Sequence, residues 1–148
     1  MAVPNGLRVP IPADFVFPKR CLFLGVEPVR DWDAKDADAQ ARDEHGVPLW
    51  AVRVMDLDEE AGRFGRRTDV VVKIAAAHQP VPPAAQHPGY PAAVEFTDVT
   101  VTPYVDASGC KGGSMPHRCR ARLAWSIRAG GMHAASDMAT MPAVDAGR

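Results

Sequence analysis

The sequence lacks any run of about 18 consecutive apolar residues, which is the length that a membrane-spanning helix requires. Residues 1–6 also lack the basic and then apolar layout of a secretory signal. We therefore expect a cytoplasmic protein with no membrane partner. Cysteine is scarce as well, and the odd set of Cys21, Cys110 and Cys119 argues against a framework of disulfides.

Familiar catalytic motifs are missing too. The sequence contains no Gly-rich phosphate loop, no His-Glu-x-x-His, no nucleophile elbow and no Cys-x-x-Cys pair. Carboxylates are frequent between Glu27 and Glu60, but they fall in expected loops, where a solvated acidic surface is the ordinary interpretation. We expect no enzymatic activity, no catalytic residues and no cofactor.

A metal site is the one cofactor question that the cysteines raise. Cys110, His117 and Cys119 lie within ten residues, and Zn²⁺ accepts such ligands. Their spacing, Cys-x6-His-x-Cys, matches no common structural zinc pattern. Cys119 also falls on the apolar face of an expected strand, where a cysteine is an ordinary core residue. We therefore expect no metal ligands.

The chain is rich in residues that break regular structure, with 14 prolines and 12 glycines among 148 residues. Short apolar and β-branched segments lie between these breaks, which is typical of strands joined by turns. This pattern predicts an all-β class, as a five-stranded OB-like barrel or a small sandwich. The expected strands are residues 21–32, 48–55, 69–74, 94–105 and 118–128.

The remaining segments divide the chain into an arm, one domain and a tail. Residues 1–18 hold four prolines and predict an extended arm, residues 19–132 a single β domain, and residues 133–148 a disordered tail. The polar stretch from Ala34 to Glu44 is a loop or one or two helical turns. A parity shift near Thr97-Asp98 predicts a β-bulge in the fourth strand.

The fifth expected strand has the clearest pattern. Residues 118–128 alternate strictly between an apolar face and a face that carries arginines. The apolar face predicts that Trp125 lies in the core with Leu123 and Ile127. Trp50 is likewise expected in the core, since it shares parity with Val52.

Charge is unevenly distributed although the net charge is −1. Glu27 to Glu60 holds eleven acids against four bases, whereas Lys111 to Arg128 holds five bases and no acid. Such a chain can present a basic face. The arginines of that face either pair with the acidic first half of the chain or contact phosphate, and the sequence leaves both interpretations open.

A second feature pointing to nucleic acid is the loop expected after the second strand. Phe64 is flanked there by Gly62 and Gly65 and by arginines, and single-stranded nucleic-acid binders stack bases on such aromatic residues. The alternative is that Phe64 folds back over the end of the barrel. The predicted nucleic-acid-binding residues are Arg53, Phe64, Arg66, Arg67, Lys73, Arg118, Arg120, Arg122 and Arg128.

Four segments resemble a known family. They are Arg42-Asp43-x-x-Gly46-x-Pro48-Leu49-Trp50-x-Val52, Val70-x-Val72-Lys73-Ile74, Val94-Glu95-Phe96-x-x-Val99-Thr100-Val101-Thr102-Pro103-Tyr104-Val105, and Arg120-x-Arg122-Leu123-Ala124-Trp125-Ser126-Ile127-Arg128-Ala129-x-Gly131-Met132. Together they are similar to small actinobacterial plasmid proteins described as replication, integration and excision activators. The resemblance covers residues 10–132 and implies a role in the replication of a mobile element or in its control. It implies no catalytic residues.

These observations predict an accessory or regulatory protein of plasmid or integrative-element replication that binds single-stranded DNA through a basic β face. A replication initiator or a transfer protein is a further expected partner. The alternative is a regulator that contacts such a protein through its acidic loops and never touches DNA.

Overall fold

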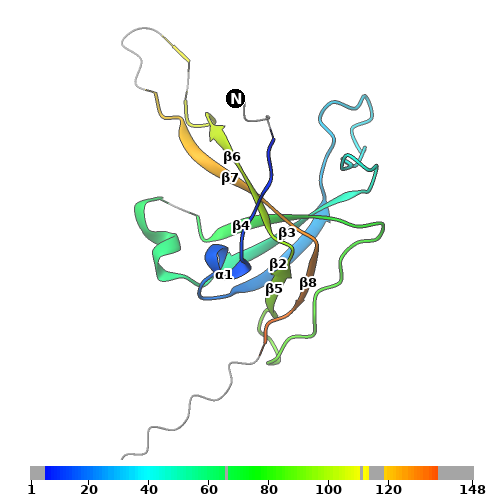
Figure 1. Ribbon diagram of the computed structural model, residues 1–148, viewed down its shortest axis with the longest axis vertical. Coiled ribbons are helices and arrows are strands. Elements are labelled where there is room, and N and C mark those ends of the chain that lie inside the picture. Colours follow the sequence, from blue (N-terminus) through cyan, green and yellow to red (C-terminus); the bar gives the residue numbers. More distant parts are fainter. Residues whose placement is uncertain (1–5, 66, 111, 114–118, 137–148) are drawn as a thin grey trace, which may run out of the picture.

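Eight strands form one curled, half-barrel sheet in the part of the chain that the computed structural model describes, residues 6–65, 67–110, 112–113 and 119–136 (Figure 1). The mainly β class is thereby confirmed. The strands are β1 (Val9–Pro10), β2 (Cys21–Pro28), β3 (Leu49–Asp56), β4 (Asp69–Ala75), β5 (Ala93–Thr97), β6 (Thr100–Asp106), β7 (Arg122–Ala129) and β8 (Gly131–Ala134). The helices are α1 (Ala13–Val16) and the 3₁₀ helix η1 (Glu59–Gly65).

The centre of the sheet is an antiparallel meander of β2, β3 and β4. Val52 of β3 lies opposite Val26 of β2 and Val72 of β4, and β-branched side chains suit this pleated, buried surface. Val52 and Val72 are fully buried in the core. These strands match the first three expected ones, but β2 ends at Pro28 rather than continuing to residue 32, because the chain beyond it pairs with its own loop, where the Ala41 N–H donates to the carbonyl oxygen of Val29.

A sharp corner interrupts the two strands that follow. β5 and β6 divide at Asp98, whose φ of 50° breaks the extended backbone, and β7 and β8 divide at Gly130. The Gly130 N–H donates to the carbonyl oxygen of Thr97 at 2.8 Å, so both breaks lie at one place. The break lies where a β-bulge was predicted, but it divides the expected fourth strand into β5 and β6 instead of forming a bulge within one strand.

This corner lets one ribbon pair with both edges of the meander. Below it, β5 pairs with β2 and β8; above it, β7 pairs with β6 and runs parallel to β4. The sheet order is consequently β1-β6-β7-β4-β3-β2-β5-β8, and the ribbon curls the sheet around its core (Figure 1).

The expected last strand needs two corrections. It begins at Arg122 rather than at residue 118, and Trp125 is not a core residue, because 53% of its surface is exposed, as is 64% of that of Leu123. β7 pairs with β4 only from Ile127 to Ala129, so the preceding half of the strand extends beyond β4 and pairs with β6. The predicted alternation leaves an apolar side here, but no core lies beneath it.

The N-terminal segment also differs from the extended arm expected over residues 1–18. Val9 and Pro10 pair with β6, α1 follows, and Phe17 is buried with its ring centroid 5.9 Å from that of Phe96. Ile11 and Val16 pack against the same core. The apolar residues between the prolines therefore cover the core instead of remaining in solvent.

The other segments are loops or short extensions. Residues 29–48 form an irregular connection with isolated bridges, Arg30 with Gln40 and Arg42 with Pro48, in place of helical turns. β8 extends into the tail expected from residue 133, and Ala135 is buried, while residues 137–148 lie outside the described part. Within the described residues, no helix is both long and apolar enough to cross a membrane.

Candidate nucleic-acid interface

A groove of about 600 Å³ lies where β7 separates from β4. β4 continues towards its start at Asp69 while β7 turns away with β6, and the space between them stays open. The residues lining this groove are Asp69, Val70, Val71, Lys73, Thr102, Tyr104, Trp125, Ser126 and Ile127.

Two aromatic side chains line the groove without being buried. Trp125 of β7 and Tyr104 of β6 are each about half exposed. The register partner of Trp125 is Pro103, and that of Tyr104 is Ala124, so the two rings leave opposite faces of the ribbon. An exposed aromatic ring at the wall of a groove can stack on a planar ligand, and nucleobases are such ligands.

Three of the predicted basic residues come together on neighbouring strands beside this groove. Lys73 of β4 is the register partner of Arg128 on β7 and of Ala51 on β3, and Arg53 follows two residues after Ala51. Because register partners project to one face of a sheet, these cations share the outer face of β3, β4 and β7. We call this set of Arg53, Lys73 and Arg128 the basic face.

The members of the basic face differ in their partners. Arg53 pairs with Asp69 at 3.2 Å between Nη2 and Oδ2, and both side chains are about half exposed. No carboxylate of the described residues lies within 4.0 Å of the Lys73 ammonium. Lys73 is therefore the cation of the groove that has no acidic partner in the described part of the chain.

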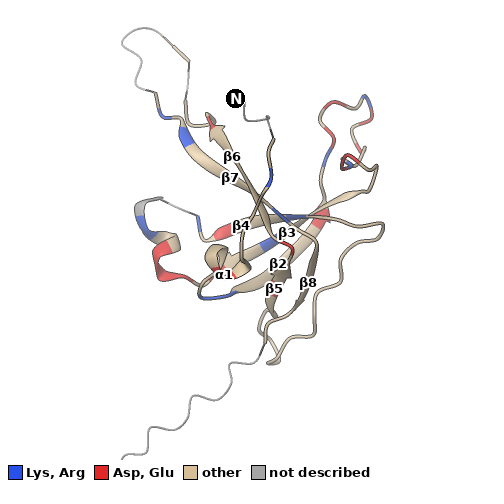
Figure 2. Cartoon of the chain, in the orientation of Figure 1, with Lys and Arg blue, Asp and Glu red and all other residues tan. Residues whose placement is uncertain are grey.

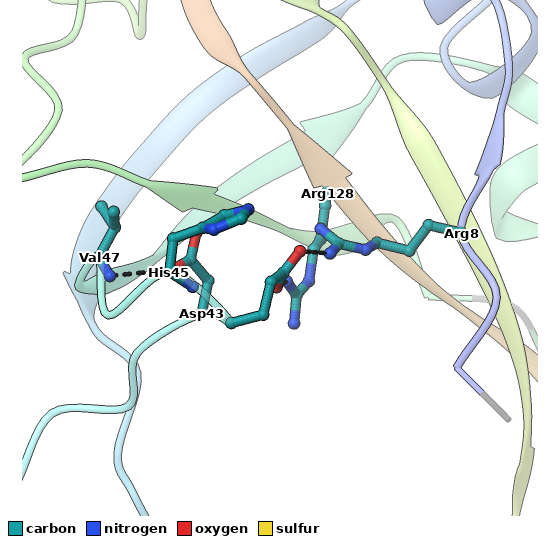
Figure 3. Close-up of polar contacts among 6 residues, drawn as sticks. Arg8, Asp43, His45, Val47 and Arg128 are labelled. Carbon is teal, nitrogen blue, oxygen red and sulfur yellow. Dashed lines mark hydrogen bonds and ion pairs between the residues drawn. The ribbon is translucent and has the colours of Figure 1, made fainter.

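Arg128 belongs to a small cluster of charges (Figure 3). Glu44 joins two cations, with one carboxylate oxygen on the Arg8 guanidinium and the other 3.8 Å from Nη1 of Arg128. Burial lowers the pKa of Arg128, the nearby Arg8 lowers it further, and Asp43 opposes the shift. Arg128 still stays protonated, as arginine does in proteins.

Asp43 is held in the same cluster by the backbone. Its Oδ1 accepts hydrogen bonds from the N–H groups of Val47 at 2.8 Å and His45 at 2.9 Å. The bond from Val47 is the main cause of the lowered pKa of Asp43. The turn lies next to Glu44, which pairs with Arg128 of β7. An acidic residue from the first half of the chain therefore does contact one of the predicted arginines.

The remaining predicted contacts are not part of this face. Arg122 pairs with Asp106 at 3.2 Å near the far end of the ribbon, where Arg120 is exposed. Arg67 lines a different hollow together with Asp56, Asp58 and Glu60. The placement of Arg66, Arg118 and the Phe64 side chain lies outside the described residues, although the Phe64 backbone belongs to η1.

Acidic residues gather on η1 and on the loop between β2 and β3 (Figure 2), and the lining of the groove itself includes Asp69. The sequence analysis missed Tyr104 and Trp125 as groove residues. Neither has a local sequence signal, because the exposure of this half of the ribbon depends on where β7 stops pairing with β4.

The cysteines separate into one buried residue and one close pair. Burial, with smaller contributions from Asp56 and Glu95, raises the pKa of the Cys21 thiol to about 12. The Sγ atoms of Cys110 and Cys119 lie 3.8 Å apart. No three metal-ligating side chains of the described residues lie together, and His117 is outside that part of the chain.

No protein-family model, no curated protein and no solved structure matches this chain.

Proposed function

We propose that this protein binds single-stranded DNA in the groove between β4 and β7, as an accessory protein of plasmid or integrative-element replication. One observation carries the DNA-binding part: Lys73, without an acidic partner among the described residues, shares the groove with the half-exposed rings of Tyr104 and Trp125. A cation for the backbone beside aromatic rings for the bases is the combination that single-strand binders use. The proposed role in the replication of a plasmid or integrative element rests on the four sequence segments that resemble the plasmid proteins named above.

The strand pairing supports an OB-like barrel as the scaffold. If the two-residue β1 is set aside, and β5 with β6 and β7 with β8 are each counted as one bent strand, five strands remain. The first pairs with the second and fourth, and the third with the second and fifth. In OB-folds, the face of the second and third strands and the loops beside it bind oligonucleotides. Those strands correspond to β3 and β4, which carry Arg53 and Lys73.

Each part of the site has a separate role in this proposal. Trp125 and Tyr104 stack on bases, Lys73 contacts a phosphate directly, and Arg53 and Arg128 exchange their carboxylate partners for phosphates. Exposed ion pairs contribute only about 0–1 kcal/mol, so such an exchange costs little. Phe64, Arg66, Arg67, Arg118, Arg120 and Arg122 remain predicted contacts.

The test is the affinity of the protein for a labelled oligothymidylate of about 15 nucleotides, which spans the site of one such barrel. Trp125→Ala should weaken binding by about 5- to 150-fold, because each stacked base contributes about 1–3 kcal/mol. Trp32→Ala is the matched control, since Trp32 is 79% exposed but lies on the loop after β2. Equal affinity of the Trp125→Ala variant and the unmodified protein would contradict the proposal.

One observation favours the alternative of a protein-binding regulator. Val105 and Leu123 are exposed and lie opposite each other in the ribbon, on the same side as Trp125. These side chains form an apolar surface next to the Arg122–Asp106 ion pair. Should the protein show no oligonucleotide binding at low salt, the alternative would stand in place of DNA binding.

A further inference from the structure

We propose that Cys110 and Cys119 form a reversible disulfide, which makes this pair a site of thiol oxidation. Their Sγ atoms are 3.8 Å apart, and a disulfide bond is about 2.05 Å long. The difference is less than 2 Å, which rotation of the two side chains can supply. This inference does not depend on the proposed DNA binding.

The ribbon brings the two thiols together from both of its strands. Asp106 and Arg122 are the final register pair of β6 and β7, and their side chains are joined by an ion pair. Cys110 follows Asp106 by four residues, and Cys119 precedes Arg122 by three. The two cysteines are therefore at similar distances along the chain from the last pair of the ribbon.

Local hydrogen bonds fix each cysteine further. The Cys110 N–H donates to the carbonyl oxygen of Ala107 at 2.9 Å, in the turn after β6. The Ala121 N–H donates to Sγ of Cys119 at 3.4 Å. Both thiols are thus positioned before any bond forms between them, which favours an intramolecular reaction.

The paired cysteines are accessible to solvent, whereas Cys21 is buried. Cys119 is exposed and Cys110 is half-buried, so a small reagent can reach the pair. Cys21 is 1% exposed, and its thiol keeps its proton to high pH. Because the thiolate is the reactive form, Cys21 should not compete.

A small-molecule disulfide is the oxidant in this proposal. The thiolate of Cys119 attacks one of its sulfurs, forming a mixed disulfide and releasing one small thiol. The thiolate of Cys110 then attacks Sγ of Cys119, forming the protein disulfide and releasing the second small thiol. Two electrons pass to the reagent, and the two protons of the protein thiols end on the two small thiols.

The test is incubation of the dilute, full-length protein with oxidised glutathione, followed by intact mass measurement and a non-reducing tryptic digest. The expected product has lost the mass of two hydrogen atoms, and its digest joins the separate peptides that contain Cys110 and Cys119. Dithiothreitol should reverse both changes. Cys21→Ser is the matched control and should react in the same way.

The single variants complete the test. Cys110→Ser and Cys119→Ser should each stop at a mixed disulfide with glutathione on the remaining member of the pair, because the resolving thiol is gone. The proposal is overturned if the unmodified protein stops at mixed disulfides, forms covalent dimers, stays fully reduced, or joins Cys21 to either of the other two.

Discussion

Lys73 and Arg128 lie directly opposite each other where β4 and β7 run parallel. Their backbones are therefore one strand spacing apart, about 4.8 Å, and both side chains leave the same face of the sheet. Glu44 reaches Arg128, whereas no carboxylate of the described part of the chain reaches Lys73. A phosphodiester strand that crosses β4 and β7 can contact both cations, and this relationship gives the DNA-binding proposal its sharpest consequences.

Lys73→Gln should flatten the salt dependence of oligonucleotide binding. Each neutralised phosphate of a single strand contributes a slope of about −0.7 to the plot of log affinity against log salt concentration. Removal of one cation should therefore make the measured slope less negative by about 0.7. Fluorescence anisotropy of a labelled oligonucleotide at several salt concentrations measures this slope.

Lys35→Gln controls for the loss of one positive charge, because Lys35 is exposed in the loop between β2 and β3. It should leave the slope unchanged. An equal change of slope in both variants would show that net charge, rather than the position of Lys73, governs binding.

Glu44→Gln should strengthen DNA binding. Glu44 occupies both Arg8 and Arg128, and its neutral amide would leave both guanidiniums available to phosphates. The slope should become more negative by about 0.7 for each arginine that then contacts a phosphate. The free energy of unfolding should fall by only about 0–1 kcal/mol, as is usual for exposed ion pairs.

Glu59→Gln makes the same change in net charge on η1, where Glu59 is exposed. Comparison of the two variants by the anisotropy titration separates the effect of freeing Arg8 and Arg128 from the effect of the changed net charge. Weaker or unchanged binding of Glu44→Gln would argue against a role for Arg128 in the interface.

Gly130→Ala should destabilise the fold by about 1–3 kcal/mol, the range for an overpacked site. A Cβ at residue 130 would lie 3.0 Å from Oδ2 and 3.1 Å from Cβ of Asp98, at the corner where the ribbon changes its partner. Urea denaturation measures the loss of unfolding free energy.

Gly25→Ala is the matched control within the same sheet. A Cβ there would meet no heavy atom within 4 Å, and alanine is easier to order than glycine in a strand. This variant should be as stable as the unmodified protein or more stable. If Gly130→Ala were as stable as the unmodified protein, the backbone at the corner would have to relax without loss of unfolding free energy, which would contradict this prediction.

Stability should also decline in alkaline solution because of Cys21. The pKa of its thiol is raised from 9.0 to about 12 by burial, so the unfolded chain loses this proton at a lower pH than the folded chain does. Between these values the folded state binds more protons, and the unfolding free energy falls by up to about 1.4 kcal/mol per pH unit.

Urea denaturation under reducing conditions from about pH 8 to about pH 10, around the ordinary pKa of a thiol, tests this dependence. Cys21→Ala lacks the ionisable group, so its stability should decline less steeply over the same range. Identical pH profiles of the two proteins would show that the thiol does not contribute.

Several elements were predictable because their signals are local. The β-branched segments of β3 and β4 and the parity shift before Asp98 specify strands and a break from neighbouring residues alone. The N-terminal segment gave the wrong expectation, since its prolines suggest an extended chain while Ile11, Val16 and Phe17 pack on a core assembled from later residues.

The candidate site was less predictable because it depends on long-range pairing. The alternation around Trp125 correctly separates two faces, but whether one face is buried depends on how far β4 extends beside β7. The contact of Glu44 with Arg128 likewise depends on how the loop after β2 folds back onto β7. Neither relationship has a signal in the residues next to it.

Photochemical cross-linking tests the central proposal most directly. An oligonucleotide that carries 5-iodouracil should join to an aromatic ring on which the modified base stacks, and mass spectrometry of the digested adduct locates that ring. We expect adducts at Trp125 or Tyr104, and we expect excess unlabelled single-stranded DNA to suppress them. No adduct at low salt, or adducts confined to residues outside the groove such as Trp32, would contradict binding of single-stranded DNA between β4 and β7.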